Sequence, residues 1–71
     1  MTDKVAVITG TSSGMGLEMA KSLLDRGFLV FGGSRSESPI DHENFIDLEL
    51  DIRKEESVIE FFSEIAKDTE G

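Results

Sequence analysis

The sequence predicts an α/β fold in which helices flank a parallel sheet. Two short, unbroken apolar runs rich in Val, Leu, Ile and Phe indicate buried strands, and stretches with helical periodicity alternate with the strands. A glycine-rich turn joins the first strand to the first helix. The predicted order along the 71 residues is therefore strand, helix, strand, loop, strand, helix.

The first predicted unit is a strand followed by an amphipathic helix. Residues 4–9 contain the run Val-Ala-Val-Ile and are expected to be buried on both faces of the sheet. The helix begins at Gly14 or Met15 and ends at Arg26. Gly27 follows, at the position where glycine often terminates a helix. The apolar face of the helix consists of Leu17, Ala20, Leu23 and Leu24.

Two further strands follow this helix. Residues 28–31 form a second buried run, which leads into Gly32-Gly33-Ser34. In residues 46–52 apolar and acidic residues alternate, which predicts a strand with one exposed face, as at a sheet edge. About nine mostly polar residues, 35–43, join these strands, fewer than the dozen or so of a usual parallel crossover.

The last predicted element is a helix that opens with Glu55 and Glu56, because acidic side chains favour the positive end of the helix dipole. Phe61 and Phe62 are expected in the core. The apolar face of this helix consists of Val58, Phe61, Phe62, Ile65 and Ala66.

Composition narrows the functional classes. With no cysteine and one histidine, neither a disulfide scaffold nor a metal site is expected. Residues 1–36 carry four Lys/Arg against three Asp/Glu, whereas residues 37–71 carry three against twelve. No basic stripe exists for nucleic acid, and an anionic ligand belongs with the first half. The longest apolar runs have four residues and no signal peptide is visible, so a soluble, cytoplasmic protein without a membrane partner is expected.

The glycine-rich turn is the strongest functional motif. It reads Thr-Gly-Thr-Ser-Ser-Gly-Met-Gly from Thr9 to Gly16. A strand that enters a helix through such a turn presents free backbone amides and the positive end of the helix dipole to a phosphate. The spacing Gly-x-x-x-Gly-x-Gly differs from the Gly-x-Gly-x-x-Gly fingerprint, and no Gly-Lys-Ser/Thr of a Walker loop follows.

This spacing resembles the cofactor turn of the short-chain dehydrogenase/reductase family. The resemblance implies a Rossmann-type parallel sheet with flanking helices, of which this chain holds the first three strands. Where Met15 stands, the family commonly has isoleucine. The resemblance implies that the three motif glycines are Gly10, Gly14 and Gly16. It also implies that Ser12, Ser13 and the amide of Met15 face the ribose and phosphates of the coenzyme.

A second matching segment lies at the end of the second strand, which in this family distinguishes NAD from NADP. An acidic residue there binds the ribose 2′-hydroxyl, whereas an arginine binds a 2′-phosphate. Here Ser34 and Arg35 follow the strand, and no acid occurs before Glu37. The resemblance therefore implies NADP(H) as the coenzyme.

A third matching segment is Asp51-Ile52 after the third strand. In the family this carboxylate accepts from the exocyclic amine of adenine, and the following amide meets the ring. Arg53 stands where Thr or Ser is often found, which is expected to weaken the helix cap and to leave the adenine contact intact.

The family transfers hydride between nicotinamide and a carbonyl or alcohol substrate, using serine, tyrosine, lysine and asparagine. This chain has no tyrosine, so no catalytic residue is assigned to it. Residues 1–71 are expected to be the N-terminal portion of one NAD(P)-binding domain, inactive alone. The family's strand order begins 3-2-1-4, and its members commonly form dimers or tetramers.

Other interpretations stay open at this stage. The chain could be a non-catalytic, regulatory nucleotide-binding module, or a one-carbon or flavin-nucleotide domain with the same turn. The hydroxyls of Thr11, Ser12 and Ser13 could be turn or cap groups. Arg35 could be merely solvated, Asp51 could be a capping acid, and His42 is expected to have no role beyond its loop.

Overall fold

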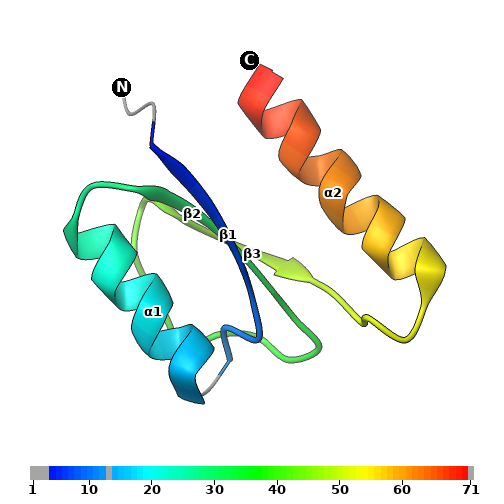
Figure 1. Cartoon of the computed structure of the whole chain (residues 1–71), viewed down its shortest axis with the longest axis horizontal. Helices are drawn as coiled ribbons and strands as arrows, with labels where there is room; N and C mark the ends of the chain where they lie inside the picture. Colours follow the sequence, from blue (N-terminus) through cyan, green and yellow to red (C-terminus); the bar gives the residue numbers. More distant parts are fainter. Residues whose placement is uncertain (1–3, 13, 71) are drawn as a thin grey trace.

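The computed structural model describes residues 4–12 and 14–70, and the elements occur in the predicted order (Figure 1). The strands are parallel, and helices flank the sheet as in a Rossmann-type arrangement. The elements are β1 (Val5–Thr9), α1 (Gly14–Asp25), β2 (Leu29–Ser34), β3 (Phe45–Glu49) and α2 (Glu55–Glu70).

The sheet has the order β1-β2-β3, with β2 in the middle, as the family's 3-2-1 order requires. Phe31 of β2 pairs with Val7 on one side and with Ile46 on the other. Backbone pairing continues past the strands: the amide of Gly10 donates to the carbonyl of Gly33 at 2.7 Å, and that of Leu50 to the carbonyl of Ser34 at 2.9 Å. The three segments therefore leave the sheet side by side at its carboxyl edge.

The two helices cover opposite faces of the sheet (Figure 1). On the α1 face, Ile8 and Val30 form a buried cluster with Ala20 and Leu24. On the other face, the buried ring of Phe61 from α2 lies over the end of β2. Since neighbouring residues of a strand point to opposite faces, the unbroken apolar run of β2 supplies both layers.

Glycines at the end of β2 allow these layers to come close. A Cβ on Gly32 would lie 2.6 Å from both the Phe45 ring and the Thr11 hydroxyl oxygen. A Cβ on Gly33 would lie 2.6 Å from the ring of Phe61. Real Cβ atoms do not approach neighbours so closely, so the middle strand has no room for a side chain at either of these two positions.

Gly27 terminates the first helix as predicted, and α1 ends at Asp25, one residue before the predicted Arg26. Gly27 has φ 86°, and its amide donates to the carbonyl of Leu24 at 3.0 Å. The amide of Phe28 donates to the carbonyl of Leu23 at 3.0 Å. This pair of bonds is the Schellman arrangement, in which a left-handed glycine satisfies the last helical carbonyls and returns the chain to the sheet.

The connection between β2 and β3 has no helix, yet the strands it joins are parallel. Ile40, half-buried, packs against the α1-face cluster and serves as the hydrophobic anchor of this segment. Near its end, the amide of Phe45 donates to the carbonyl of His42 at 3.0 Å, which closes a turn. This apolar contact and local hydrogen bonds thus hold a connection that usually contains a crossover helix.

Three burial predictions are wrong. Val5 and Val7 of β1 are 41% and 43% exposed, because α2 packs against β3 and the end of β2. Phe62 is 55% exposed, because it lies about 100° around the helix from Phe61. Ile52 is 76% exposed, because the chain leaves the sheet after Leu50 and the alternation of the sequence no longer describes a strand.

Within the described part of the chain, neither helix has the length and apolar character needed to cross a bilayer.

Candidate functional site

A cleft of about 520 Å³ opens at the carboxyl edge of the sheet. Ligands of open α/β sheets bind in the crevice outside this edge, and the volume lies within the roughly 300–1,000 Å³ of small-molecule sites. Three segments contribute its walls, one from the end of each strand. The lining residues are Thr9, Gly10, Ser12, Gly33, Ser34, Arg35, Ser36, Leu50, Asp51, Ile52 and Arg53.

The glycine turn contributes the first wall through Thr9, Gly10 and Ser12. Gly10 and Gly14 have φ values of 75° and 64°, in the left-handed region that L side chains rarely adopt. A Cβ on either glycine would find no atom within 4 Å, so both face open space. A side chain at either position would project into this open space. The turn therefore leaves its backbone uncovered at both glycines.

Gly16 has a different task, because it lets the helix approach the turn. A Cβ on Gly16 would lie 2.2 Å from the carbonyl oxygen of Gly10, closer than any atoms can be without a shift. The first turn of α1 is thereby held against the end of β1. That first turn contains no acidic residue, so no carboxylate offsets the positive end of the helix dipole.

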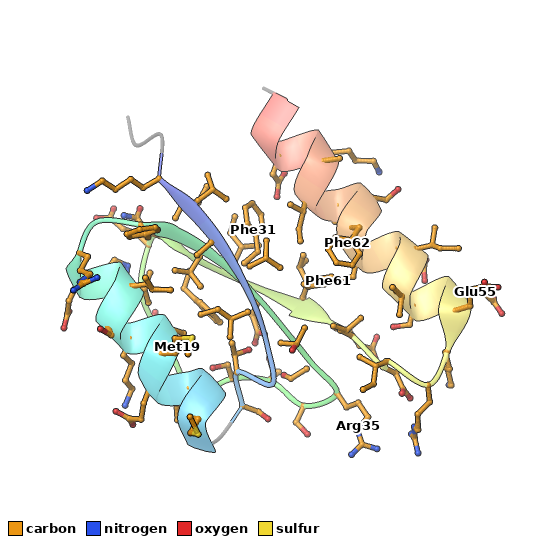
Figure 2. All side chains as sticks on the ribbon, in the orientation of Figure 1. Met19, Phe31, Arg35, Glu55, Phe61 and Phe62 are labelled. Carbon is orange, nitrogen blue, oxygen red and sulfur yellow. The ribbon has the colours of Figure 1, made fainter. Side chains whose placement is uncertain are left out.

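Arg35 lies immediately beyond β2 and lines the second wall. Figure 2 shows its side chain extending away from the sheet at the end of the green strand. Arg35 is exposed, and no described residue forms an ion pair with it. The preceding residue, Ser34, is buried, and its hydroxyl donates to the carbonyl of Ser36. A guanidinium with five donors thus stands at the cleft on a hydrogen-bonded backbone.

The third wall holds an aspartate–arginine pair. Arg53 donates to Asp51 through Nε at 3.0 Å to Oδ1 and through Nη2 at 3.0 Å to Oδ2. These side-chain bonds, with a backbone bond from the Arg53 amide, lower the pKa of Asp51 to about 2. The pairing also raises the pKa of Arg53. Asp51 is consequently a carboxylate at neutral pH, and its own amide donates to the Ser57 hydroxyl at 2.8 Å.

Arg53 was not predicted as a cleft residue. Its signal was nevertheless in the sequence, since an opposite charge two residues after Asp51 at a strand end suggests a local pair. The weakened helix cap is also visible: α2 begins after Lys54, and the amide of Ser57 donates to the backbone carbonyl of Lys54 at 3.1 Å rather than to a side chain of the preceding turn.

Most of the predicted site residues converge on this cleft. The six that line it are Gly10, Ser12, Ser34, Arg35, Asp51 and Ile52. Gly14, Met15 and Gly16 are not part of its lining: Gly14 and Met15 start α1, with Met15 83% exposed, and Gly16 packs under Gly10. Ser13 lies outside the described residues. Buried Thr11 lies beneath the turn, and its hydroxyl has no hydrogen-bond partner among the described residues.

Known proteins resemble this chain in both sequence and fold. NADPH-dependent 1-acyldihydroxyacetone phosphate reductase of Saccharomyces cerevisiae is 34% identical over 65 residues, covering 82% of this chain and 22% of that protein. The X-ray structure of an alcohol dehydrogenase from the archaeon Thermococcus sibiricus, complexed with 5-hydroxy-NADP, has a TM-score of 0.80 at 33% identity, covering 92% of this chain and 32% of that one.

A short chain dehydrogenase from Leptospira borgpetersenii, crystallised with bound NAD⁺, has the same fold, with a TM-score of 0.84 at 24% identity over 99% of this chain and 28% of that one. The chain spans 15–22% of the length of the curated relatives that it matches. The family model described as short chain dehydrogenase matches residues 4–71. Through this match and the shared fold, the chain belongs to the short-chain dehydrogenase family.

Proposed function

We propose that this chain binds the adenosine and diphosphate portion of NADP(H) for an oxidoreductase that acts on a carbonyl or alcohol substrate. The observation that carries the proposal is the cleft at the carboxyl edge, which brings the glycine turn, Arg35 and Asp51 together. The bound nicotinamide would supply or accept the hydride. The residues of this chain bind and orient the coenzyme, and none of them is assigned to catalysis.

In this proposal, the diphosphate accepts hydrogen bonds from backbone amides of the glycine turn. A Cβ at Gly10 or Gly14 would find no atom within 4 Å, so a phosphate oxygen can approach the turn without a steric barrier. The amide of Gly10 already donates to the carbonyl of Gly33, so the proposed donors are the amides that follow it in the turn. The positive end of α1 favours the negative charge. Ser12, Ser13 and the amide of Met15 complete the donors toward the ribose and phosphates in this proposal.

In this proposal, the guanidinium of Arg35 binds the 2′-phosphate of NADP. The guanidinium is exposed, lines the cleft and has no carboxylate partner among the described residues, so phosphate binding breaks no ion pair. Bidentate arginine–phosphate bonds are charge-assisted and stronger than neutral hydrogen bonds. The NADPH dependence of the yeast relative and the NADP derivative in the archaeal enzyme support this assignment.

In this proposal, the carboxylate of Asp51 accepts from the exocyclic amine of adenine, and the backbone amide of Ile52 meets the ring. Asp51 already accepts three hydrogen bonds from Arg53, yet a carboxylate offers about four lone-pair sites and can accept the exocyclic amine as well. Because these bonds from Arg53 fix the orientation of the carboxylate, the pair presents an oriented acceptor to the adenine edge.

The test is calorimetric titration of the full-length protein with NADP and with NAD at equal ionic strength. The proposal expects both to bind and NADP to bind more tightly. A correctly folded protein that binds neither coenzyme would refute the assignment of the cleft. Tighter binding of NAD would refute the role of Arg35 alone.

A further inference from the structure

Ser38 joins two of the segments that form the cleft. It lies in the connection between β2 and β3, three residues after Arg35. Its hydroxyl donates to the carbonyl oxygen of Thr11, 2.7 Å away and 27 residues distant in the sequence. Thr11 belongs to the glycine turn and is fully buried. The Ser38 hydroxyl therefore ties the connection to the turn on which the diphosphate is proposed to bind.

The backbone of Ser38 makes a second tie. Its amide donates to Oδ2 of Asp47 in β3, 2.9 Å away. A single residue thus fixes the connection to the glycine turn on one side and to the edge strand on the other. The hydroxyl is the side-chain group that bonds to the turn, and it also accepts a long hydrogen bond from the amide of Ile40 at 3.5 Å. The bond from the Ser38 amide to Asp47 would persist without the hydroxyl.

The remaining anchors of this segment lie on either side of Ser38. Before it, the hydroxyl of Ser34 donates to the carbonyl of Ser36. After it, Ile40 packs into the α1-face cluster. Neither contact involves the glycine turn, whose backbone bond to β2 runs from the Gly10 amide to the carbonyl of Gly33, two residues before Arg35. Without the Ser38 bond, the span that carries Arg35 is held to β2 and to the core, while its position relative to Thr11 is no longer held by a side-chain hydrogen bond.

We infer that Ser38 is a positioning residue for coenzyme selection: its bond to Thr11 holds the Arg35 segment at the separation that spans the diphosphate and the 2′-phosphate of one NADP molecule. Arg35 itself is exposed, and ordering a long side chain and its loop on binding costs conformational entropy. A backbone that is already tethered reduces this cost. The inference rests on the proposed binding of the 2′-phosphate by Arg35.

The experiment compares Ser38→Ala with the wild-type full-length protein by titration with NADP and with NAD. Loss of one net hydrogen bond corresponds to about 2- to 12-fold in affinity, and this loss is expected for NADP, with NAD changed less than about 2-fold. Ser38→Thr keeps the hydroxyl and is expected to restore the ratio of the two affinities. Ser38→Cys keeps the volume with a weaker donor and is expected to behave like Ser38→Ala.

A second background separates positioning from a general structural role. In Arg35→Ala protein, Ser38→Ala is expected to leave the ratio of NADP to NAD affinity unchanged, because there is no guanidinium left to position. Ser63→Ala, an exposed serine on α2, is the matched control and is expected to change neither affinity. Equal weakening of both coenzymes by Ser38→Ala would overturn the inference.

The two hypotheses fail differently. If Arg35→Ala alone leaves the affinity ratio at its wild-type value, the proposed NADP selection by Arg35 is wrong. If Arg35→Ala lowers the ratio and Ser38→Ala does not, only the positioning role of Ser38 is wrong.

Discussion

A Cβ on Gly16 would stand only 2.2 Å from the carbonyl oxygen of Gly10. The two glycines come from opposite sides of the turn, one after β1 and one in the first turn of α1. Their contact fixes how near the helix start lies to the strand end. The atoms that a Cβ on Gly16 would meet belong to the backbone, so no flexible side chain could move aside to make room for it.

Gly16→Ala is therefore expected to destabilise the protein by about 1–3 kcal/mol, the usual cost of forcing extra volume into a packed site. It should also weaken coenzyme binding, because the first amides of α1 move away from the turn. Urea unfolding and titration with NADP measure the two effects. The control is Ser22→Ala, an exposed position on the same helix, expected within about 0.5 kcal/mol of wild type. Unchanged stability of Gly16→Ala would contradict the contact.

Arg35→Ala is expected to weaken NADP binding about 10- to 150-fold, since a hydrogen bond to a charged group contributes roughly 1.5–3 kcal/mol. NAD has no 2′-phosphate, so its affinity should change little. Isothermal titration of both coenzymes is the measurement. Arg26→Ala removes a positive charge from the exposed end of the first helix and controls for net charge. Equal losses for NADP and NAD would exclude a specific role for Arg35.

Arg53→Ala is expected to raise the pKa of Asp51 from about 2 toward its ordinary value of 3.8, because the side-chain bonds from Arg53 are the largest cause of the lowered pKa. The folded-state pKa lies below the unfolded one, so the stabilisation by the pair is complete above about pH 4 and is lost as pH falls toward 2. Carboxyl ¹³C NMR titration measures the pKa. Lys54→Ala, which removes a minor charge contribution, should shift it far less. Comparable shifts in both variants would argue against the bidentate pair.

Gly33→Ala is expected to destabilise the protein because the new Cβ would meet the Phe61 ring at 2.6 Å and Leu50 Cδ2 at 2.9 Å. Phe61→Leu removes part of the ring, so the double variant should be more stable than the sum of the single effects predicts. Coupling between touching residues is typically about 0.5–3 kcal/mol. Denaturant unfolding of all four proteins gives this coupling. Strict additivity would show that the ring does not contact this position.

Local sequence signals predicted the elements well because each has a short-range cause. Gly27 terminates α1 through φ 86°, a conformation that favours glycine, and helical periodicity placed Ala20 and Leu24 inside. The family resemblance assigned Arg35 and Asp51 to one coenzyme, and both line the same cleft, because carboxyl ends of neighbouring parallel strands share one edge of the sheet.

Burial and long-range ties were harder to predict because they depend on what covers each face. The apolar run of β1 looks like a fully buried strand, yet Val5 and Val7 lie on the part of the α2 face that is formed by β1, and α2 packs against β3 instead. The alternation through Ile52 continues in the sequence after the strand has ended at Glu49. The bond from Ser38 to Thr11 joins residues 27 apart, and no local pattern announces it.

At Gly32 and Gly33 the middle strand is only one peptide layer thick. Phe45 and Thr11 touch it from one side and Phe61 from the other, directly before the chain enters the cleft. Any residue larger than glycine would push one of these layers outward, and Thr11 and Leu50, which lie next to Ser12 and Asp51 in the sequence, are among the residues that would have to move. The absence of side chains at Gly32 and Gly33 therefore lets the layers on both faces lie close to the strand beside the cleft.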